Sequence, residues 1–430
     1  MIHLKTIVVP DSVKTLQTGC FQRINKMITI LFGGTTLPSI CGNDIYLLSN
    51  SLNIKISNTL ENGTKICNYN TENSLIVQTL GTSVKSIIDE SSSYIYGEGE
   101  INKYGWITSP LYSHRNVIST VQIGEGITKI GAYLFQGLEK VQSFNIPNSV
   151  TTIESFAFRD CTSLKSFQFG KNIKAIGYNP FIQCSSLITV NIHPQNTFID
   201  FKDNIIYMTS NMRLNTYLFA NINSTSYTIP SYIKEIGTYS FMYNKLSAIH
   251  IHENVQTIGS NPFGYSLQLS TITIDDTNKN YTIKDGVLFT KDMKKLITFP
   301  GCLNKTSYSV LFGVETIGDN AFNNAIYIQT LLIPNSVKTF DSKPFRFMSS
   351  LTKMIISGSV QTINSNEQFG ETKLLTSIIY DGLYEPTKCF SSMFLSSKIT
   401  TIKVSTLYKG SETSFCGNKI TISKIGRAHV

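Results

Sequence analysis

The chain repeats itself every 23 residues over much of its length. Three consecutive segments show the repeat, at residues 123–145, 146–168 and 169–191. A period of this length is typical of a solenoid, in which each repeat forms one coil and buries its apolar side chains against the coils on either side. The repeat therefore predicts a stacked array with a long surface for binding, and the repeat itself carries no catalytic motif.

Apolar residues occupy fixed positions within each coil. When positions are counted from the first residue of the segment 146–168, apolar residues stand at offsets 0, 4, 7, 12, 18 and 21. Offset 12 is a phenylalanine in eight coils, and we expect one ring from each coil to stack on the next as an aromatic spine. These phenylalanines are Phe21, Phe135, Phe158, Phe181, Phe241, Phe263, Phe322 and Phe345.

Apolar and polar side chains alternate around the end of each coil. In residues 164–169, Phe167 and Phe169 would point inward, while Ser166 and Gln168 would point outward. Stacked coils would pair these short strands into a parallel sheet, with about 4.8 Å between neighbouring strands. Any ligand on the sheet face would meet the outward row. The candidate ligand face is therefore Asn145, Ser166, Gln168, Thr189, Asn191, His250, Thr271 and Thr273.

Offset 8 is a glycine in five coils, and Asp341 and Asn364 take its place in two others. These three residue types tolerate a positive φ, so the pattern predicts a tight turn after the buried residue at offset 7. The five glycines are Gly131, Gly177, Gly237, Gly259 and Gly318.

Two coils are longer than the others, at residues 192–228 and 274–309, and their extra segments resemble each other. Asp203-Asn204 and Asp285-Gly286 stand before alternating apolar residues, which predicts an added β-hairpin in each coil. Insertions in a solenoid map to one face. They can form its binding side or simply cover the edge of the sheet.

We divide the chain into partial N-terminal repeats (1–31), degenerate or unassigned repeats (32–122), the main array (123–379) and a closing segment (380–423). Residues 424–430 resemble a translated sequencing adapter, and we expect this tail to be non-native. The first residues read as the tail of a coil without a polar cap, so we expect the chain to be a fragment. The predicted fold is a β-rich α/β solenoid, with a parallel sheet on one face, short turns or helices on the other, and β-hairpin insertions.

The known motifs of catalysis are missing from the sequence. It holds no H-E-x-x-H, no G-x-S-x-G, no phosphate loop and no dinucleotide fingerprint, so we expect neither an enzyme nor a bound cofactor. The net charge of +9 is scattered, without basic runs and interleaved aromatic residues, which argues against nucleic-acid binding. The sequence contains no run of 18 apolar residues, so it predicts no membrane span.

Two further features have an ordinary structural interpretation beside a functional one. His250 and His252 stand two residues apart on an expected strand and would be able to share a metal ion, but surface histidines at this spacing are usually bystanders, so we predict no metal site. Trp106, the only tryptophan, would be able to anchor a partner, although burial in a degenerate coil is the favoured interpretation.

The repeat resembles the leucine-rich repeats of BspA-type surface proteins. The family pattern I-P-x-S-V-x-x-I-G-x-x-A-F-x-x-C-x-x-L-x-x-I stands nearly complete in residues 146–168, and its opening recurs at residues 229–237 and 333–337. The segments 380–382, 385–389, 408–410 and 415–417 look like the closing segment of such arrays. The resemblance covers about two-thirds of the chain, and residues 32–122 fit it poorly.

The resemblance implies a leucine-rich-repeat superhelix that is surface-exposed or secreted and binds protein or glycoprotein partners, with adhesion as the usual role. An intracellular scaffold that uses the same face is the second hypothesis. An enzyme whose catalytic domain lies outside the fragment is the third, and no residue favours it. Cys389 and Cys416 lie in the closing segment and are the expected disulfide if the protein is exported. Cys161 and Cys184 share offset 15 and are expected to pack as small apolar residues.

Overall fold

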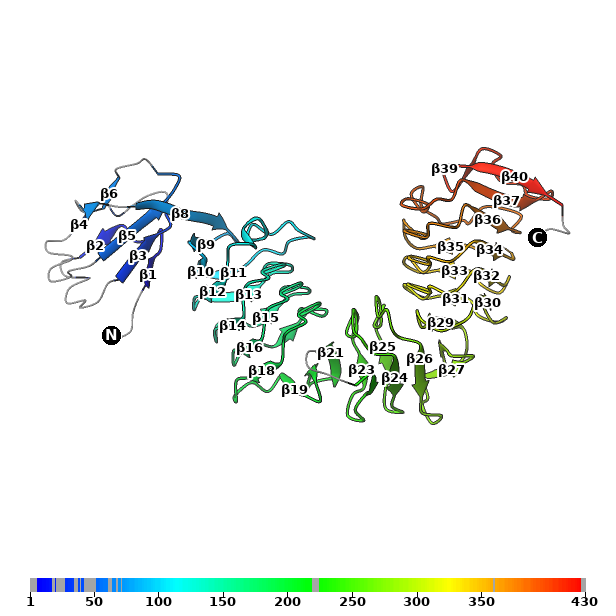
Figure 1. Cartoon of the computed structure of the whole chain (residues 1–430), viewed down its shortest axis with the longest axis horizontal. Helices are drawn as coiled ribbons and strands as arrows, with labels where there is room; N and C mark the ends of the chain where they lie inside the picture. The colour runs from blue at the N-terminus through cyan, green and yellow to red at the C-terminus, as the bar shows by residue number, and fades with distance from the viewer. Residues whose placement is uncertain are drawn as a thin grey trace. The chain divides into compact units, whose positions relative to one another are not determined.

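The computed structural model describes residues 6–17, 20, 28–34, 38, 40–41, 52–60, 64–66, 69–70, 72–218, 224–358 and 360–426. The chain divides into two compact units, Met1–Lys202 and Asp203–Val430, which are described separately below. Both are built almost wholly of short strands (Figure 1). Phe21 of the expected spine and residues 427–430 of the expected tail lie outside the described residues.

The N-terminal unit begins with a seven-stranded sheet, within which β8–β9–β10 are antiparallel while β1–β3–β5–β8 and β10–β12 are parallel. Its strands, in spatial order, are β1 (Thr6–Val9), β3 (Ile28–Phe32), β5 (Leu52–Ser57), β8 (Glu72–Thr79), β9 (Val84–Asp89), β10 (Ser92–Gly97) and β12 (Thr120–Ile123). The described part of the stretch 32–122, which sequence patterns could not divide into coils, contributes β5, β8, β9 and β10 to this sheet. The antiparallel hairpins explain why no 23-residue period is visible there.

From residue 123 onward, each coil of the N-terminal unit contributes to two parallel ladders. One ladder consists of β14 (Ser143–Asn145), β16 (Ser166–Phe169) and β18 (Thr189–Ile192), and the other of β11 (Gly99–Glu100), β13 (Ile127–Ile130), β15 (Thr152–Ile153) and β17 (Ala175–Ile176). Shorter elements complete the unit: β2 (Thr15–Leu16), β4 (Ile40–Cys41), β6 (Lys65–Ile66), β7 (Tyr69–Asn70), β19 (Ile199–Lys202) and the 3-10 helix η1 (Tyr112–His114).

The C-terminal unit repeats the two-ladder plan. The ladder that contains the outward row consists of β22 (Ser226–Thr228), β24 (Ala248–Ile251) and β26 (Thr271–Ile274), and then of a six-stranded sheet: β30 (Ser307–Ser309), β32 (Thr330–Ile333), β34 (Lys353–Ile356), β36 (Ser377–Tyr380), β37 (Thr401–Ser405) and β40 (Thr421–Ile425). The opposite ladder contains β23 (Glu235–Ile236), β25 (Thr257–Ile258), β31 (Thr316–Ile317), β33 (Thr339–Phe340) and β35 (Thr362–Ile363).

The predicted parallel sheet is confirmed, but the α/β assignment and the predicted short helices are wrong. The described residues contain no α-helix, and η1 is the one helical element among them. The physical reason lies at offsets 10 and 14, which are left-handed in seven coils and so interrupt any right-handed helix. The residues at offset 10 are Tyr133, Phe156, Asn179, Tyr239, Asn261, Asn320 and Lys343, and those at offset 14 are Gly137, Asp160, Gln183, Tyr243, Tyr265, Asn324 and Phe347.

The predicted left-handed turn at offset 8 is also wrong. None of the five glycines there has a positive φ, and neither Asp341 nor Asn364 does. Glycine is needed because the preceding coil passes too close. A Cβ atom at Gly131 would lie 1.8 Å from the carbonyl oxygen of Asn102, and one at Gly237 would lie 2.5 Å from the carbonyl oxygen of Leu214. The glycine therefore sets how closely coils stack.

The aromatic spine is confirmed within runs of consecutive coils, and in the C-terminal unit the described rings form two runs rather than one continuous stack. Phe158 stacks between Phe135 and Phe181, with ring centroids 5.2 Å and 5.4 Å away. The backbone reinforces the stack, because the N–H of Phe158 donates to the carbonyl oxygen of Pro180 in the next coil at 2.9 Å. The residue at offset 11 takes part only through its carbonyl oxygen, which accepts this hydrogen bond. Proline suits this position because it needs no backbone N–H there. In the C-terminal unit the stacked or tilted rings are Tyr217, Phe241 and Phe263, and then Phe299, Phe322, Phe345, Phe369 and Phe394.

A hydrogen-bond ladder lies beside the spine at offset 15. The thiol of Cys161 contacts the carbonyl oxygen of Phe135 at 3.2 Å, and the thiol of Cys184 contacts that of Phe158 at 3.1 Å. Ser266 takes the same role in the C-terminal unit, where its hydroxyl donates to the carbonyl oxygen of Phe241 at 3.1 Å. Position 15 therefore favours a small donor that satisfies the carbonyl of the spine residue in the preceding coil, and cysteine is one of several that fit.

The two inserted segments form antiparallel hairpins. β20 (Ile205–Met208) pairs with β21 (Arg213–Tyr217), and β27 (Tyr281–Lys284) pairs with β28 (Val287–Thr290), which pairs in turn with β29 (Lys295–Thr298). Asp285 and Gly286 both have positive φ, as a two-residue hairpin turn requires. β21 and β29 join the opposite ladder, and the hairpins contribute Tyr217 and Phe299 to the spine. They are part of the packed wall of the solenoid.

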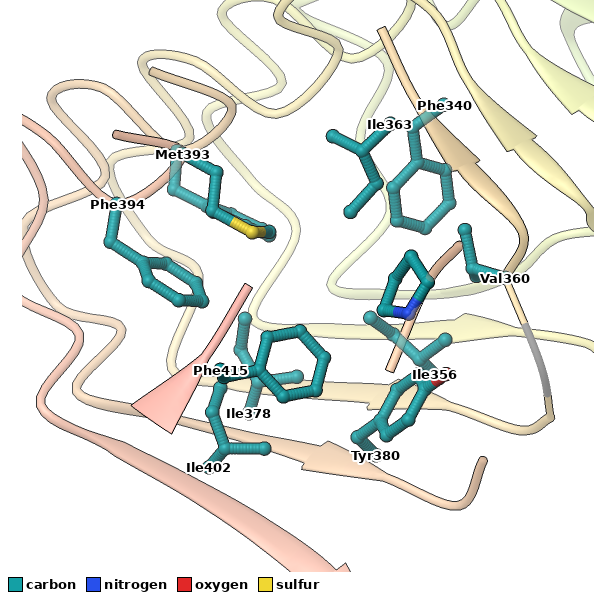
Figure 2. Close-up of a pocket in the computed structure, with 12 residues that line it drawn as sticks. Phe340, Ile356, Val360, Ile363, Ile378, Tyr380, Met393, Phe394, Ile402 and Phe415 are labelled. Atoms are coloured by element: carbon teal, nitrogen blue, oxygen red, sulfur yellow. The ribbon is translucent and has the colours of Figure 1, made fainter. Parts of the chain in front are cut away.

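The closing segment seals the C-terminal end of the core. Phe394 and Phe415 pack toward Ile378 and Ile402 of the last coils (Figure 2). They leave an apolar void of about 20 Å³, which is too small for a ligand. β38 (Ser414–Phe415) and β39 (Asn418–Lys419) form a short hairpin beside this core.

The structure joins Cys389 and Cys416 by a disulfide, with their Cα atoms 5.8 Å apart. This bond closes a loop of 27 residues around the end of the array. The carboxylate of Glu385 accepts hydrogen bonds from the backbone N–H of Cys416 at 2.9 Å and from the hydroxyl of Tyr408 at 3.3 Å.

We predict that Phe322→Ala lowers the free energy of unfolding of the C-terminal unit by about 3–5 kcal/mol, because it leaves a cavity inside the spine. Phe312 lies ten residues earlier and is 82% exposed, so Phe312→Ala is a matched control with an expected change within about 0.5 kcal/mol. Urea denaturation followed by circular dichroism measures both. Equal effects of the two substitutions would contradict the spine.

We predict that Cys389→Ser lowers the free energy of unfolding of the closing segment by about 3–4 kcal/mol, from the chain entropy that the closed loop removes. Alkylation of the denatured, unreduced protein, read by peptide mass spectrometry, is expected to leave Cys389 and Cys416 unlabelled. Cys302, a free cysteine, is the internal control and is expected to be labelled. Labelling of all three would show that the bond does not form.

Candidate functional site

Strand register aligns the predicted ligand face of the N-terminal unit. Asn145, Gln168 and Asn191 are direct neighbours across β14, β16 and β18, and Ser166 and Thr189 are neighbours in the parallel row. The side-chain amides of Asn145 and Asn191 make no hydrogen bond within the described chain. Gln168 donates to the carbonyl oxygen of Phe169 at 3.3 Å. The row is an uncharged line of donors and acceptors that faces outward at strand spacing.

The C-terminal unit contains the other three residues of the predicted face. His250 and Thr273 are neighbours across β24 and β26, and Thr271 lies opposite Ala248 in the adjacent row. The imidazole of His250 contacts the hydroxyl of Thr273 at 2.9 Å through Nδ1 and the carboxylate of Asp275 at 3.0 Å through Nε2. The structure thus brings these three residues together into one hydrogen-bonded group.

His250 and His252 share a carboxylate in this structure. The Nε2 atom of His252 lies 3.9 Å from the second oxygen of Asp275. The pKa of Asp275 is lowered, first by the backbone N–H of Glu253, which donates to its carboxylate at 2.9 Å, and then by the two imidazoles. Among the described residues, no three His, Cys, Asp or Glu side chains converge in a way that would hold a metal ion.

The six-stranded sheet presents a different face, which the sequence analysis did not include. Every second residue of these strands is buried. In three successive coils, the partly exposed residue between two buried residues is also apolar. Register places Leu332 beside Ile355, and Ile355 beside Ile379. The next residue in this row is Lys403, which lies opposite Ile379. The signal was present in the sequence, since residues 330–333, 353–356 and 377–380 lack the usual alternation.

Trp106 is half-exposed, so the prediction that it is buried is wrong. The guanidinium of Arg159 lies over its ring, 4.0 Å from the centroid. The adjacent Ile107 has a positive φ of 55°, and its backbone N–H donates to the side chain of Gln136 at 2.9 Å. The loop is therefore fixed against the outer turn of the next coil.

An open cavity of about 690 Å³ lies in the N-terminal unit, beside the ends of β1, β10 and β12. Its polar groups bind one another. Lys85 forms an ion pair with Asp11, and the hydroxyl of Tyr96 donates to the same carboxylate at 3.1 Å. Burial and the nearby Asp11 raise the pKa of Tyr96, which keeps the phenol protonated.

The array buries the thiols of Cys161 and Cys184. Burial raises the pKa of Cys161 and of Cys184, and thiolates are the reactive form of cysteine.

In the part of the chain that the structure describes, no helix is long and apolar enough to cross a membrane.

Comparisons with solved structures find leucine-rich repeat proteins at low sequence identity. The chain is similar to crystal structures of a leucine-rich repeat protein from Eubacterium ventriosum (20% identity, 82% of this chain and 85% of the other, TM-score 0.48) and of a leucine-rich cell surface protein from Faecalibacterium prausnitzii (22% identity, 82% and 96%, TM-score 0.44). It is also similar to the pneumococcal vaccine antigen PcpA (15% identity, 82% and 99%, TM-score 0.39). A search of curated proteins found no significant match.

The family comparison extends the repeats beyond the part that sequence patterns could divide. The model of the BspA type leucine-rich repeat region matches six times, over residues 1–95, 106–213, 202–292 and 295–421. These matches include most of the stretch 32–122 that the motif fitted poorly. They agree with the stacked coils of both units, and the chain therefore belongs to the BspA-type leucine-rich repeat family.

Proposed function

We propose that the protein is a non-catalytic binding protein of the cell surface or the secreted space, and that it contacts protein or glycoprotein partners through its parallel sheet face. The observation that carries the proposal is the aligned row Asn145–Gln168–Asn191. Two of its three amides have no partner within the described chain, so a ligand can satisfy them without breaking an internal bond.

The spacing of the row favours repeated, individually weak contacts. Polar side chains recur at this position on β14, β16 and β18, and the C-terminal unit has His250 and Thr273 at the same position on β24 and β26. A partner with a repeated or extended surface would engage several positions at once, and its affinity would rise through effective concentration. Such contact suits adhesion to matrix or cells.

The closing segment supports an oxidising location. Cys389 and Cys416 are close enough to bond, and stable disulfides are common in exported proteins and rare in the cytosol. An intracellular scaffold that uses the same face is the alternative, and it requires both cysteines to be reduced. The oxidation state of this pair in protein isolated from its natural source separates the two locations.

We predict that replacing Gln168, Asn191 and Thr273 together with glutamate weakens adhesion at least tenfold, because the three carboxylates add charge and remove donors from the face. Binding to immobilised extracellular-matrix glycoproteins and to cultured epithelial cells is measured with purified protein. The control variant, Thr162→Glu with Ser185→Glu and Gln268→Glu, adds the same charge at exposed turn positions outside the sheet. Unchanged adhesion of the first variant with an intact circular dichroism spectrum would remove the sheet face as the site.

A further inference from the structure

The outward face of the six-stranded sheet differs in kind from the rest of the array. Leu332, Ile355 and Ile379 form a continuous aliphatic stripe across three neighbouring strands. Each side chain is partly exposed while the residues before and after it are buried. At the corresponding outward positions of β16, β18, β24 and β26, the residues are Gln168, Asn191, His250 and Thr273.

Cations border the stripe. Lys403 continues the aliphatic row on β37, and Lys353 lies two residues before Ile355 on β34. Neither lysine forms an ion pair within the described chain. The two outward rows of this sheet contain no carboxylate between β30 and β37. Asp381 follows β36 and pairs with neither lysine.

The composition of this surface selects among possible occupants. Two lysines beside three aliphatic side chains are too few for nucleic-acid backbone binding, which relies on many phosphate contacts. A second copy of the chain would bring its own net charge of +9 against the lysines. The stripe is flat and only partly exposed, so it has no protruding side chains to enter the hydrocarbon of a membrane.

We propose that this face, named here the Leu332–Ile379 stripe, binds an acidic segment of a partner protein that carries aliphatic side chains next to aspartate or glutamate. The aliphatic groups of the segment would cover Leu332, Ile355 and Ile379, and its carboxylates would pair with Lys353 and Lys403. Neighbouring strands lie about 4.8 Å apart, so the three side chains span about 10 Å, the length of about three residues of an extended segment laid across the strands. The inference deepens the binding function proposed above, and it concerns a part of the sheet face that the glutamate variant does not touch.

The test uses the purified full chain and a random peptide display library. Enriched peptides are expected to combine Asp or Glu with Leu, Ile or Val. Their synthetic versions are then titrated by fluorescence anisotropy against the full chain and two variants. The first is Leu332→Thr with Ile355→Thr and Ile379→Thr, and the second is Lys353→Glu with Lys403→Glu.

Both variants are expected to weaken peptide binding at least tenfold, and raising NaCl from 50 to 300 mM is expected to weaken binding to the unmodified chain. The control, Leu267→Thr with Leu374→Thr and Leu407→Thr, replaces exposed aliphatic side chains at turn positions outside the sheet and is expected to change affinity less than twofold. The lysine variant changes only solvent-facing charge, so it keeps the test valid if the threonine variant unfolds.

Several results would overturn the proposal. One is a library that enriches basic or uncharged peptides, or none at all. Another is binding that both variants retain. If the unmodified chain dimerises and the threonine variant does not, the stripe binds a second copy of the chain instead. Binding to phosphatidylserine vesicles that depends on the stripe would assign it to a membrane. Adhesion assays are independent of all these results, so failure of the stripe does not decide the wider binding function.

Discussion

The structure depends on one contact that recurs between consecutive coils within each run of spine rings, at the spine residue, which is the phenylalanine of offset 12 in the plain coils. Its ring stacks on the ring of the neighbouring coil, and its backbone N–H donates to the carbonyl of offset 11 in that coil, as Phe322 does to Pro344 at 2.9 Å. A single residue thus fixes both apolar packing and backbone register. The other ladders follow from it. The donor at offset 15 satisfies the spine carbonyl, and the glycine at offset 8 lets the coils approach to this distance.

Much of the fold could be predicted because periodic burial is visible in a single sequence. The spine and the outward row Asn145–Gln168–Asn191 both follow from counting offsets, and register places them as expected. The second ladder and the lack of α-helix could not be predicted in the same way. Strands of two residues, such as β15 and β17, are too short to show an alternation of apolar and polar residues. Tyr133 and Lys343 have a positive φ, but tyrosine and lysine are not residue types that indicate this conformation in a sequence.

The two candidate surfaces also differ in how well a single sequence predicts them. A polar row stands out against apolar neighbours, so the sequence was sufficient to predict it. An aliphatic row such as Leu332, Ile355 and Ile379 has the composition of core, and only the burial of both flanking residues reveals that it faces outward. Trp106 was misjudged for a related reason. Its partner Arg159 lies 53 positions away and belongs to another coil, so their stacking has no local signature.

The fixed distance between contacting coils also bears on how the chain folds. Many hydrogen bonds between adjacent coils join residues 22–27 positions apart, as in the pairs Ser247–Thr225 and Thr372–Phe345. Each new coil therefore closes a short loop, at a small and nearly constant cost in entropy. Folding is expected to start wherever a few coils first assemble and to spread in both directions, one coil at a time. The hairpins at 205–217 and 281–298 interrupt this local order with antiparallel pairings, and they mark natural borders between cooperative units.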